Sequence, residues 1–181
     1  MEPKSNLPRR RATRLQDYDY CQSGFYFVTI CVQHRKCIFG TMIDGKMQLN
    51  ELGNIVTEYW NHIPQHFSSV EIGDYVIMPN HIHGIIALND VGTRSPRPKN
   101  SNKELTDNTS SPSLGKIIAY FKYQSTKHIN QYHNTPGTRI WQRNYHDHVI
   151  RDNIDLQRLR QYIQSNPMKW ELDQLHPDNN R

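Results

Sequence analysis

Several short stretches of the chain alternate apolar and polar residues, which is the pattern of β-strands that bury one face. This pattern predicts strands at residues 24–33, 70–78, 81–88 and 139–150. Pro79-Asn80 separates the second of these strands from the third and is expected to fold the chain back on itself. Within residues 36–50, Asp44-Gly45 predicts the tight turn of a hairpin.

Helical spacing of apolar residues appears in three other segments, at residues 51–67, 113–131 and 153–165. In the last of these, Leu156, Leu159 and Ile163 form one apolar stripe. Asp152 is a suitable N-cap for that helix, and Pro167 forces the chain out of helical geometry close behind it.

The order of these elements is strand, helix, two strands, helix, strand, and then the final helix. It predicts an α/β (α+β) ferredoxin-like sandwich, an antiparallel sheet covered by helices on one face. The last helix would then lie near the open face of the sheet. The sequence shows no internal repeat.

With 181 residues the chain is long enough for one domain with a real core. We expect a flexible basic arm at 1–15, a single domain at 16–175 and a tail at 176–181, with the chain after Trp170 loosely packed. Residues 90–112 are rich in Ser, Asn, Thr, Pro and Lys and predict a disordered insertion. The alternative is a segment that becomes ordered on a DNA hairpin.

Charge is concentrated at the start of the chain. The formal net charge is +5, and Lys4 and four arginines against Glu2 give residues 1–14 a net +4. A basic arm of this kind is a common contact for nucleic-acid phosphates, although it could equally be a solubilising terminus. The arginines of the arm are Arg9, Arg10, Arg11 and Arg14.

Two classes of protein are disfavoured by composition. No apolar run approaches 18 residues and no signal-peptide core stands at the start, so neither a membrane span nor secretion is expected. Cys21, Cys31 and Cys37 are odd in number and lack metal-site spacing, so we interpret them as reduced thiols of a cytoplasmic protein.

Candidate chemistry lies first in the strand at 81–88. His81 and His83 flank Ile82, so both imidazoles point to one face of the strand while Ile82 points to the other. Such a pair is half of a divalent-cation site, although most His-x-His pairs bind no metal. His146-Asp147-His148 is a second pair, and it is the weaker candidate because a buried strand would not favour Asp147 as an inward residue.

The final helix carries the other half. Asp155, Arg158, Tyr162 and Asn166 follow one another at helical spacing along one flank of it. A phenol and an amide therefore share the C-terminal end of the helix, where the helix dipole tolerates a cation. The alternative for Tyr162 is ordinary packing at the edge of the core.

The His-hydrophobe-His strand, followed by a helix with Tyr162-Ile-x-x-Asn166-Pro, resembles the single-tyrosine HUH transposases, and most closely their REP-associated branch. The similarity extends over roughly residues 10 to 170. It includes Phe121-Lys122 with Thr126 and three longer matching segments, Tyr26–Cys31, Val76–Gly84 and Trp141–Arg151.

The resemblance implies a metal-dependent endonuclease and strand transferase for single-stranded or hairpin DNA, acting through a 5′-phosphotyrosine. Carried over by position, Tyr162 is the nucleophile, and His81, His83 and Asn166 are the metal ligands. Two imidazoles and an amide oxygen suit Mg²⁺ or Mn²⁺. A monomer is expected for this branch, with a homodimer as the alternative. The residues expected to contact DNA are Arg9, Arg10, Arg11, Arg14, Lys122 and Arg158.

Two other functions remain open at this stage. The chain could be a nucleic-acid-binding protein that keeps the fold without cutting, or a metal-dependent phosphoesterase that does not use tyrosine. Arg158 likewise has two candidate partners, a DNA phosphate or the carboxylate of Asp155.

Overall fold

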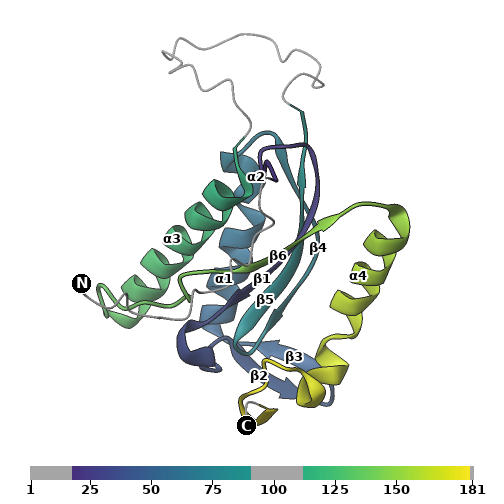
Figure 1. Cartoon of the computed structure of the whole chain (residues 1–181). Coiled ribbons are helices and arrows are strands. Elements are labelled where there is room, and N and C mark those ends of the chain that lie inside the picture. The colour runs from purple at the N-terminus through teal and green to yellow at the C-terminus, as the bar shows by residue number, and fades with distance from the viewer. Residues whose placement is uncertain (1–17, 91–111, 180–181) are drawn as a thin grey trace, which may run out of the picture.

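The computed structural model describes residues 18–90 and 112–179 of the chain. Its centre is a four-stranded antiparallel sheet in the order β4-β5-β1-β6 (Figure 1). The strands are β1 (Gly24–Cys31), β4 (Val70–Met78), β5 (His81–Leu88) and β6 (His146–Ile150). The inner strands β1 and β5 are the ones that the hydrophobic pattern marks most clearly, because they are covered on both faces.

A separate hairpin pairs β2 (Gly40–Ile43) with β3 (Lys46–Leu49). Asp44 and Gly45 both have positive φ, at 50° and 70°, as a two-residue hairpin turn requires. The turn predicted from Asp44-Gly45 is therefore confirmed.

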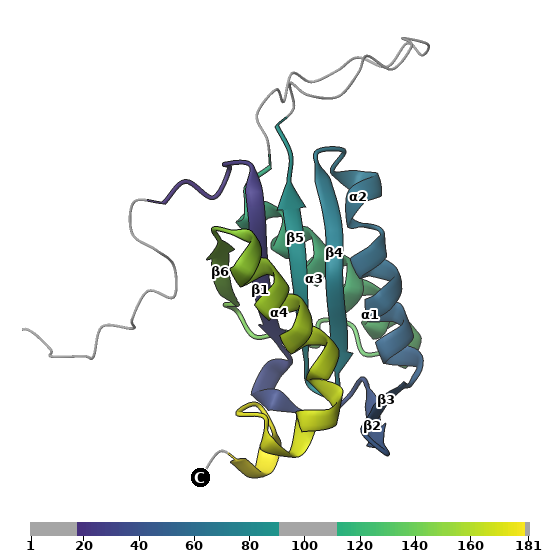
Figure 2. The same cartoon turned by 90° about the vertical axis from the view of Figure 1, so that its right-hand side faces the viewer.

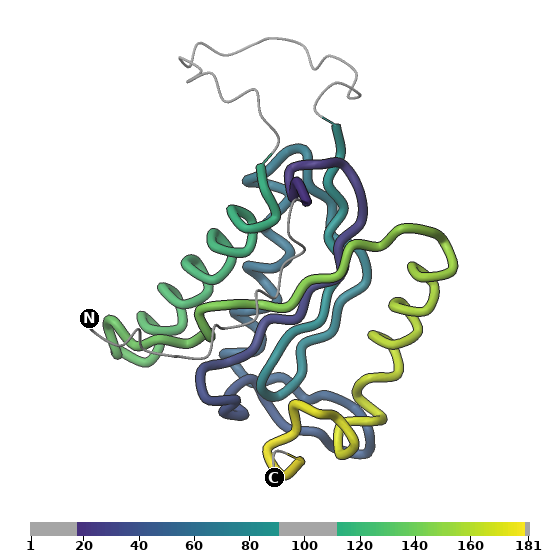
Figure 3. Tube along the Cα trace, in the orientation of Figure 1, coloured from purple at the N-terminus to yellow at the C-terminus, as the bar shows by residue number. Residues whose placement is uncertain are grey.

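Helices cover both faces of the sheet unequally. α1 (Glu51–Asn61), α2 (Ile63–His66) and α3 (Leu114–His133) lie on one face, and α4 (Asn153–Ser165) lies alone across the other (Figures 1, 2 and 3). The predicted α+β fold class is confirmed, including the placement of the last helix on the open face. Short 3₁₀ turns span Gln33–Arg35, Pro167–Leu172 and Pro177–Asn179.

Two predicted boundaries are wrong. The strand expected at 139–150 begins only at His146. Before it, Trp141 forms an isolated bridge with Val32, and the carbonyls of residues 142–144 accept hydrogen bonds from the ammonium of Lys122. The helix expected at 51–67 is interrupted at His62, since Pro64 in the following turn cannot donate a backbone hydrogen bond.

The main core lies between the sheet and α1–α3, around Trp60, Tyr26 and Phe121. Gly84 of β5 allows Trp60 to approach the sheet, since a Cβ at this position would lie 2.4 Å from Trp60 Cζ2. A smaller core fills the space beneath α4. It consists of Ile85, Ile150, Leu156, Leu159 and Ile163.

Part of the chain after Trp170 is held against the sheet, although most of its residues are exposed. Trp170 is buried, and the carbonyl of Leu175 accepts a hydrogen bond of 2.8 Å from Asn80 Nδ2. The predicted arm at 1–15 and nearly all of the predicted insertion at 90–112 lie outside the described residues. None of the helices in the described part of the chain is long and apolar enough to cross a membrane.

Candidate metal and nucleophile site

His81 and His83 project from β5 toward α4, while Ile82 enters the main core, as strand alternation requires. Both imidazoles are buried, and their Nε2 atoms lie 3.1 Å apart. On the last turns of α4, Tyr162 places its hydroxyl oxygen 3.3 Å from His83 Nε2. One chain therefore brings the two histidines and the tyrosine together without a second copy.

Asn80 fixes the tautomer of His81. The side-chain amide nitrogen of Asn80 donates to two backbone carbonyls, those of Arg35 at 3.1 Å and Leu175 at 2.8 Å. Its amide oxygen must then face His81 Nδ1, 2.7 Å away, and can only accept a hydrogen bond there. His81 consequently carries its hydrogen on Nδ1 and presents the lone pair of Nε2 to the site.

His83 has a matching support on the neighbouring strand. Thr29 lies opposite His83 in the β1–β5 register, and its hydroxyl is 2.8 Å from His83 Nδ1. Phe27 stacks on the same ring, with 5.4 Å between the ring centroids. Both imidazoles are thus held through Nδ1, which is the usual arrangement of histidines that bind metal through Nε2.

Both histidines are neutral at ordinary pH. Burial, together with the positive charge of Arg35, lowers the pKa of His81 from 6.5 to about 3. Burial and the neighbouring His81 also lower the pKa of His83 well below 6.5. Neutral imidazole is the form that binds a metal ion.

The two Nε2 atoms fit a shared cation. Two lone pairs 3.1 Å apart repel each other unless a proton or a cation lies between them. Adjacent ligand atoms of a six-coordinate ion with bonds of about 2.1 Å are about 3.0 Å apart. The spacing of the histidines is therefore that of two neighbouring ligands.

Asn166 is at the C-cap of α4 and is only 3% exposed. Its amide nitrogen donates to Asp173 Oδ2 at 3.3 Å, while its Oδ1 is buried and accepts no hydrogen bond from the described residues. Asn166 lines the same cleft as His83, and an orphaned amide oxygen there suits the ligand expected from the sequence resemblance.

Asp173 is a site residue that the sequence analysis missed. Ligand atoms of Asp173, His81 and His83 all lie within 4.8 Å of one another. No sequence signal marked it, because it follows Pro167 and Trp170, where the chain was expected to be loosely packed. Only the path of the C-terminal segment brings its carboxylate back to β5.

Tyr162 is half-exposed and borders a cleft of about 870 Å³ that also includes His83, Asn166 and Asp173. Burial and the charge of Asp173 raise the pKa of the Tyr162 phenol, while a hydrogen bond with Asn166 lowers it. The phenol is therefore neutral at pH 7 and a weak nucleophile unaided.

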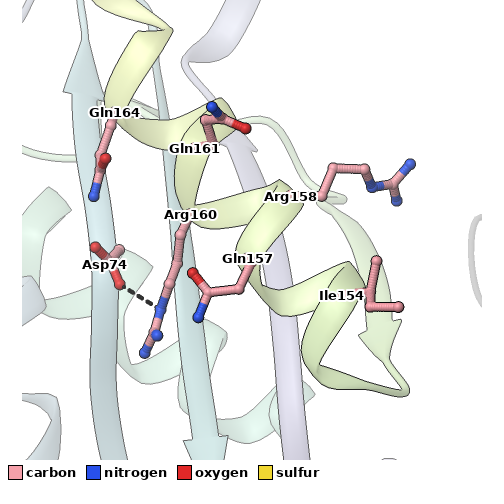
Figure 4. A pocket seen from close by; sticks show the side chains of 7 residues that line it. All are labelled: Asp74, Ile154, Gln157, Arg158, Arg160, Gln161 and Gln164. Carbon is pink, nitrogen blue, oxygen red and sulfur yellow. Dashed lines mark ion pairs between the residues drawn. The ribbon is translucent and has the colours of Figure 1, made fainter.

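Arg158 forms an ion pair with Asp155, which is one of the two partners expected for it from the sequence. Its Nη2 lies 2.6 Å from Asp155 Oδ1, and His148 Nε2 lies 2.6 Å from the other oxygen of the same carboxylate. Figure 4 shows Arg158 pointing away from Arg160, which instead pairs with Asp74 of β4 at 3.0 Å. Arg158 remains exposed, so contact with DNA stays a prediction.

Lys122 belongs to another part of the molecule. It is on α3, and its ammonium donates to the carbonyls of Gln142, Arg143 and Asn144 at 2.9, 3.4 and 3.0 Å. Burial lowers its pKa to about 8. Contact of Lys122 with DNA stays a prediction. The four arginines of the arm, Arg9, Arg10, Arg11 and Arg14, lie outside the described residues.

No family model matches the chain. It is 40% identical over 176 residues to an uncharacterised protein of Haemophilus influenzae, covering 96% of this chain and 97% of the relative. A second protein of that organism, provisionally named a REP-associated tyrosine transposase, is 28% identical over 179 residues, or 88% of this chain and 84% of that protein.

A solved REP-associated tyrosine transposase, bound to a REP hairpin, has the same fold with a TM-score of 0.57. The two chains are 18% identical over 89% of this chain and 76% of the solved one.

The antiparallel sheet presents two histidines on one strand to a tyrosine-bearing helix, which is the arrangement that the resemblance to the single-tyrosine HUH transposases predicts. In sequence the chain is similar to a relative provisionally named a REP-associated tyrosine transposase, and it shares the fold of a solved transposase of that kind.

Proposed function

We propose that this protein is a metal-dependent enzyme that nicks single-stranded DNA and transfers the strand through a covalent bond to Tyr162. One observation carries the proposal: the Tyr162 hydroxyl lies 3.3 Å from His83 Nε2, which is itself 3.1 Å from the Nε2 of His81. The site opens to the cleft, where a DNA backbone can reach the phenol.

In the nicking step the phenol oxygen of Tyr162 forms a bond to phosphorus and the bond from phosphorus to the 3′ oxygen breaks. The phenolic proton leaves to water in the cleft, and the departing oxygen takes up a proton to become a 3′-hydroxyl. The DNA 5′ end remains on Tyr162 as a phosphotyrosine. A later attack by a 3′-hydroxyl on this bond restores the phosphodiester, so strand transfer needs no external energy source.

The residues fit a divalent cation, which His81, His83 and Asn166 would hold through two nitrogens and the amide oxygen. When bound, Mg²⁺ or Mn²⁺ supplies positive charge that offsets the charge developing on the phosphate oxygens and on the phenol. The chain's own contribution is to keep both imidazoles neutral and oriented and to hold the phenol within reach.

The substrate we propose is the single-stranded end of a hairpin-forming repeat. The solved relative is bound to a REP hairpin, and the similarity of fold supports a DNA partner of that kind here. A monomer is the proposed active form, because one chain holds the histidines and the tyrosine together.

The test is a covalent adduct. The protein is incubated with labelled single-stranded DNA that carries a hairpin, in the presence of Mn²⁺, and separated under denaturing conditions. We expect a shifted band that is lost with a chelator and in Tyr162→Phe. Tyr123→Phe is the matched control, because Tyr123 is 65% exposed on α3 and should leave the adduct unchanged.

Two results would change the assignment. Cleavage by Tyr162→Phe at the parental rate would favour a phosphoesterase that does not use tyrosine. Hairpin binding by the parent, with neither adduct nor cleavage, would favour a DNA-binding protein that does not cut.

A further inference from the structure

Asp173 lies beside the paired histidines although neither the resemblance nor the histidine strand points to it. Its Oδ2 is 3.9 Å from His81 Nε2, and its side chain is 7% exposed. Ligand atoms that share one ion with bonds of about 2.1 Å are about 3.0 Å apart when adjacent and about 4.2 Å apart when opposite. The carboxylate therefore falls within one coordination sphere with His81 and His83.

Hydrogen bonds orient the carboxylate. Oδ1 of Asp173 accepts a bond of 2.6 Å from the backbone nitrogen of Leu175, and Oδ2 accepts the longer bond from Asn166. The first bond fixes the rotation of the carboxylate and leaves Oδ2 facing the imidazoles.

The segment that carries Asp173 is itself anchored to the histidine strand. Asn80 donates to the carbonyl of Leu175, and its amide oxygen holds His81. Arg35 adds a bond of 3.4 Å to the carbonyl of Gln174. One asparagine thus positions both a histidine ligand and the turn that delivers the carboxylate.

The charge of Asp173 favours a cation at this position. Its contacts in the described structure include a backbone N–H, the amide of Asn166 and the neutral imidazole of His81, and Arg35 lines the same cleft. Neutral donors offset only part of the free-energy cost of removing a carboxylate from water. A divalent cation between Asp173 and the histidines would offset the remainder.

We propose that Asp173 is a carboxylate ligand of the divalent cation bound by His81 and His83, in addition to Asn166. The inference rests on the cation site of the proposed function and deepens it. With Asp173 the protein supplies two nitrogens and a charged oxygen, a donor set that suits Mn²⁺ and Mg²⁺.

Mn²⁺ binding to the full-length protein without DNA tests this directly. Free Mn²⁺ is followed by electron paramagnetic resonance during a titration of the parent, Asp173→Asn and Asp178→Asn. We expect at least a tenfold loss of affinity in Asp173→Asn, which keeps the shape of the side chain. Asp178→Asn should stay within twofold, because that side chain is 90% exposed at the surface.

The parent itself provides a second measurement that needs no folded variant. In crystals soaked with Mn²⁺, anomalous scattering should place the ion about 2.2 Å from Asp173 Oδ2. Parental affinity in Asp173→Asn, or an ion held by the histidines with Asp173 outside bonding distance, would overturn the inference.

Failure of this inference is distinguishable from failure of the proposed function. If Asp173→Asn binds Mn²⁺ normally while the parent still forms the DNA adduct, only the ligand role of Asp173 is wrong. If Asp173 binds the ion but the parent forms no adduct, the nicking function is wrong and the metal site stands.

Discussion

At the scale of single residues, the side chain of Asn80 links the two halves of the site. The sequence predicts only a turn at Pro79-Asn80, yet the side chain of Asn80 forms three hydrogen bonds that join separate segments of the chain. The amide reaches the carbonyls of Arg35 and Leu175, and the oxygen selects the tautomer of His81. A side chain that supports a metal ligand in this way commonly affects metal affinity nearly as much as the ligand does.

Replacing Asn80 with alanine should lower Mn²⁺ affinity about 10- to 100-fold, because His81 loses the acceptor that fixes its ring. Calorimetric titration with Mn²⁺ measures this change. Asn61→Ala is the matched control, since Asn61 bonds only to Tyr75 at the surface in the described structure. Equal losses in both variants would show that the effect is not specific to the site.

The buried histidines also predict how stability depends on pH. The pKa of His81 is about 3 in the folded protein and 6.5 when exposed, so the unfolded chain binds more protons between these values. The stability that neutral, buried His81 contributes to the folded state is fully present above pH 6.5 and is lost as the pH falls toward 3. His83 acts in the same direction.

We therefore expect the free energy of unfolding of the metal-free protein to fall by a few kcal/mol, in order of magnitude, between pH 6.5 and 3. Urea denaturation at a series of pH values measures it. His81→Gln should flatten the dependence. If the free energy of unfolding of that variant depended on pH as steeply as that of the parent, His81 would not be the group responsible.

At the scale of elements, α4 carries Tyr162, the proposed nucleophile, and is held by a narrow apolar stripe. Leu156, Leu159 and Ile163 pack on Ile85 of β5 and on Ile150 at the end of β6. This small cluster fixes both the height and the rotation of the helix above the histidines. Loss of packing there should move the Tyr162 hydroxyl away from His83.

Two isoleucines of the same helix test this point. Ile163→Ala should reduce the free energy of unfolding by about 2–4 kcal/mol and slow adduct formation, because Ile163 is 2% exposed next to Tyr162. Ile154→Ala should change stability by less than about 0.5 kcal/mol, because Ile154 is 82% exposed. Thermal denaturation and the adduct assay measure the two effects, and equal behaviour of the variants would exclude the packing role.

At the scale of the whole molecule, the site lies within one chain, since His83 and Tyr162 of the same copy are in contact. A mixture of His83→Ala and Tyr162→Phe should therefore form no adduct. Exchange of α4 between two copies would instead recreate an intact site and restore part of the activity. Light scattering of the parent during size-exclusion chromatography gives the mass that accompanies either result.

The charge distribution makes a further prediction for the whole chain. Residues 1–14 carry five of the 22 Lys and Arg residues and a net +4. If these cations contact DNA phosphates, their removal should lower the slope of log affinity against log salt by up to about 3 for single strands. Fluorescence anisotropy at several salt concentrations measures the slope. An unchanged slope would favour a solubilising role.

The sequence by itself determined the local elements and the residues that share each face. Strand alternation put His81 and His83 on one side of Ile82, and helical spacing set Tyr162 one turn before Asn166. The predicted helix at 153–165 matches α4 at both ends, since its cap residue and the following proline are local signals. These features depend on neighbours within a few residues, which the sequence displays directly.

Only the tertiary structure decided which distant groups meet. His83 and Tyr162 are 79 positions apart, and their contact depends on α4 crossing the open face of the sheet. Asp173 joins the site because Asn80 anchors the C-terminal segment, and Lys122 turns to three carbonyls because the loop before β6 closes over it. Such contacts are set by packing between elements, and no periodicity in the sequence encodes them.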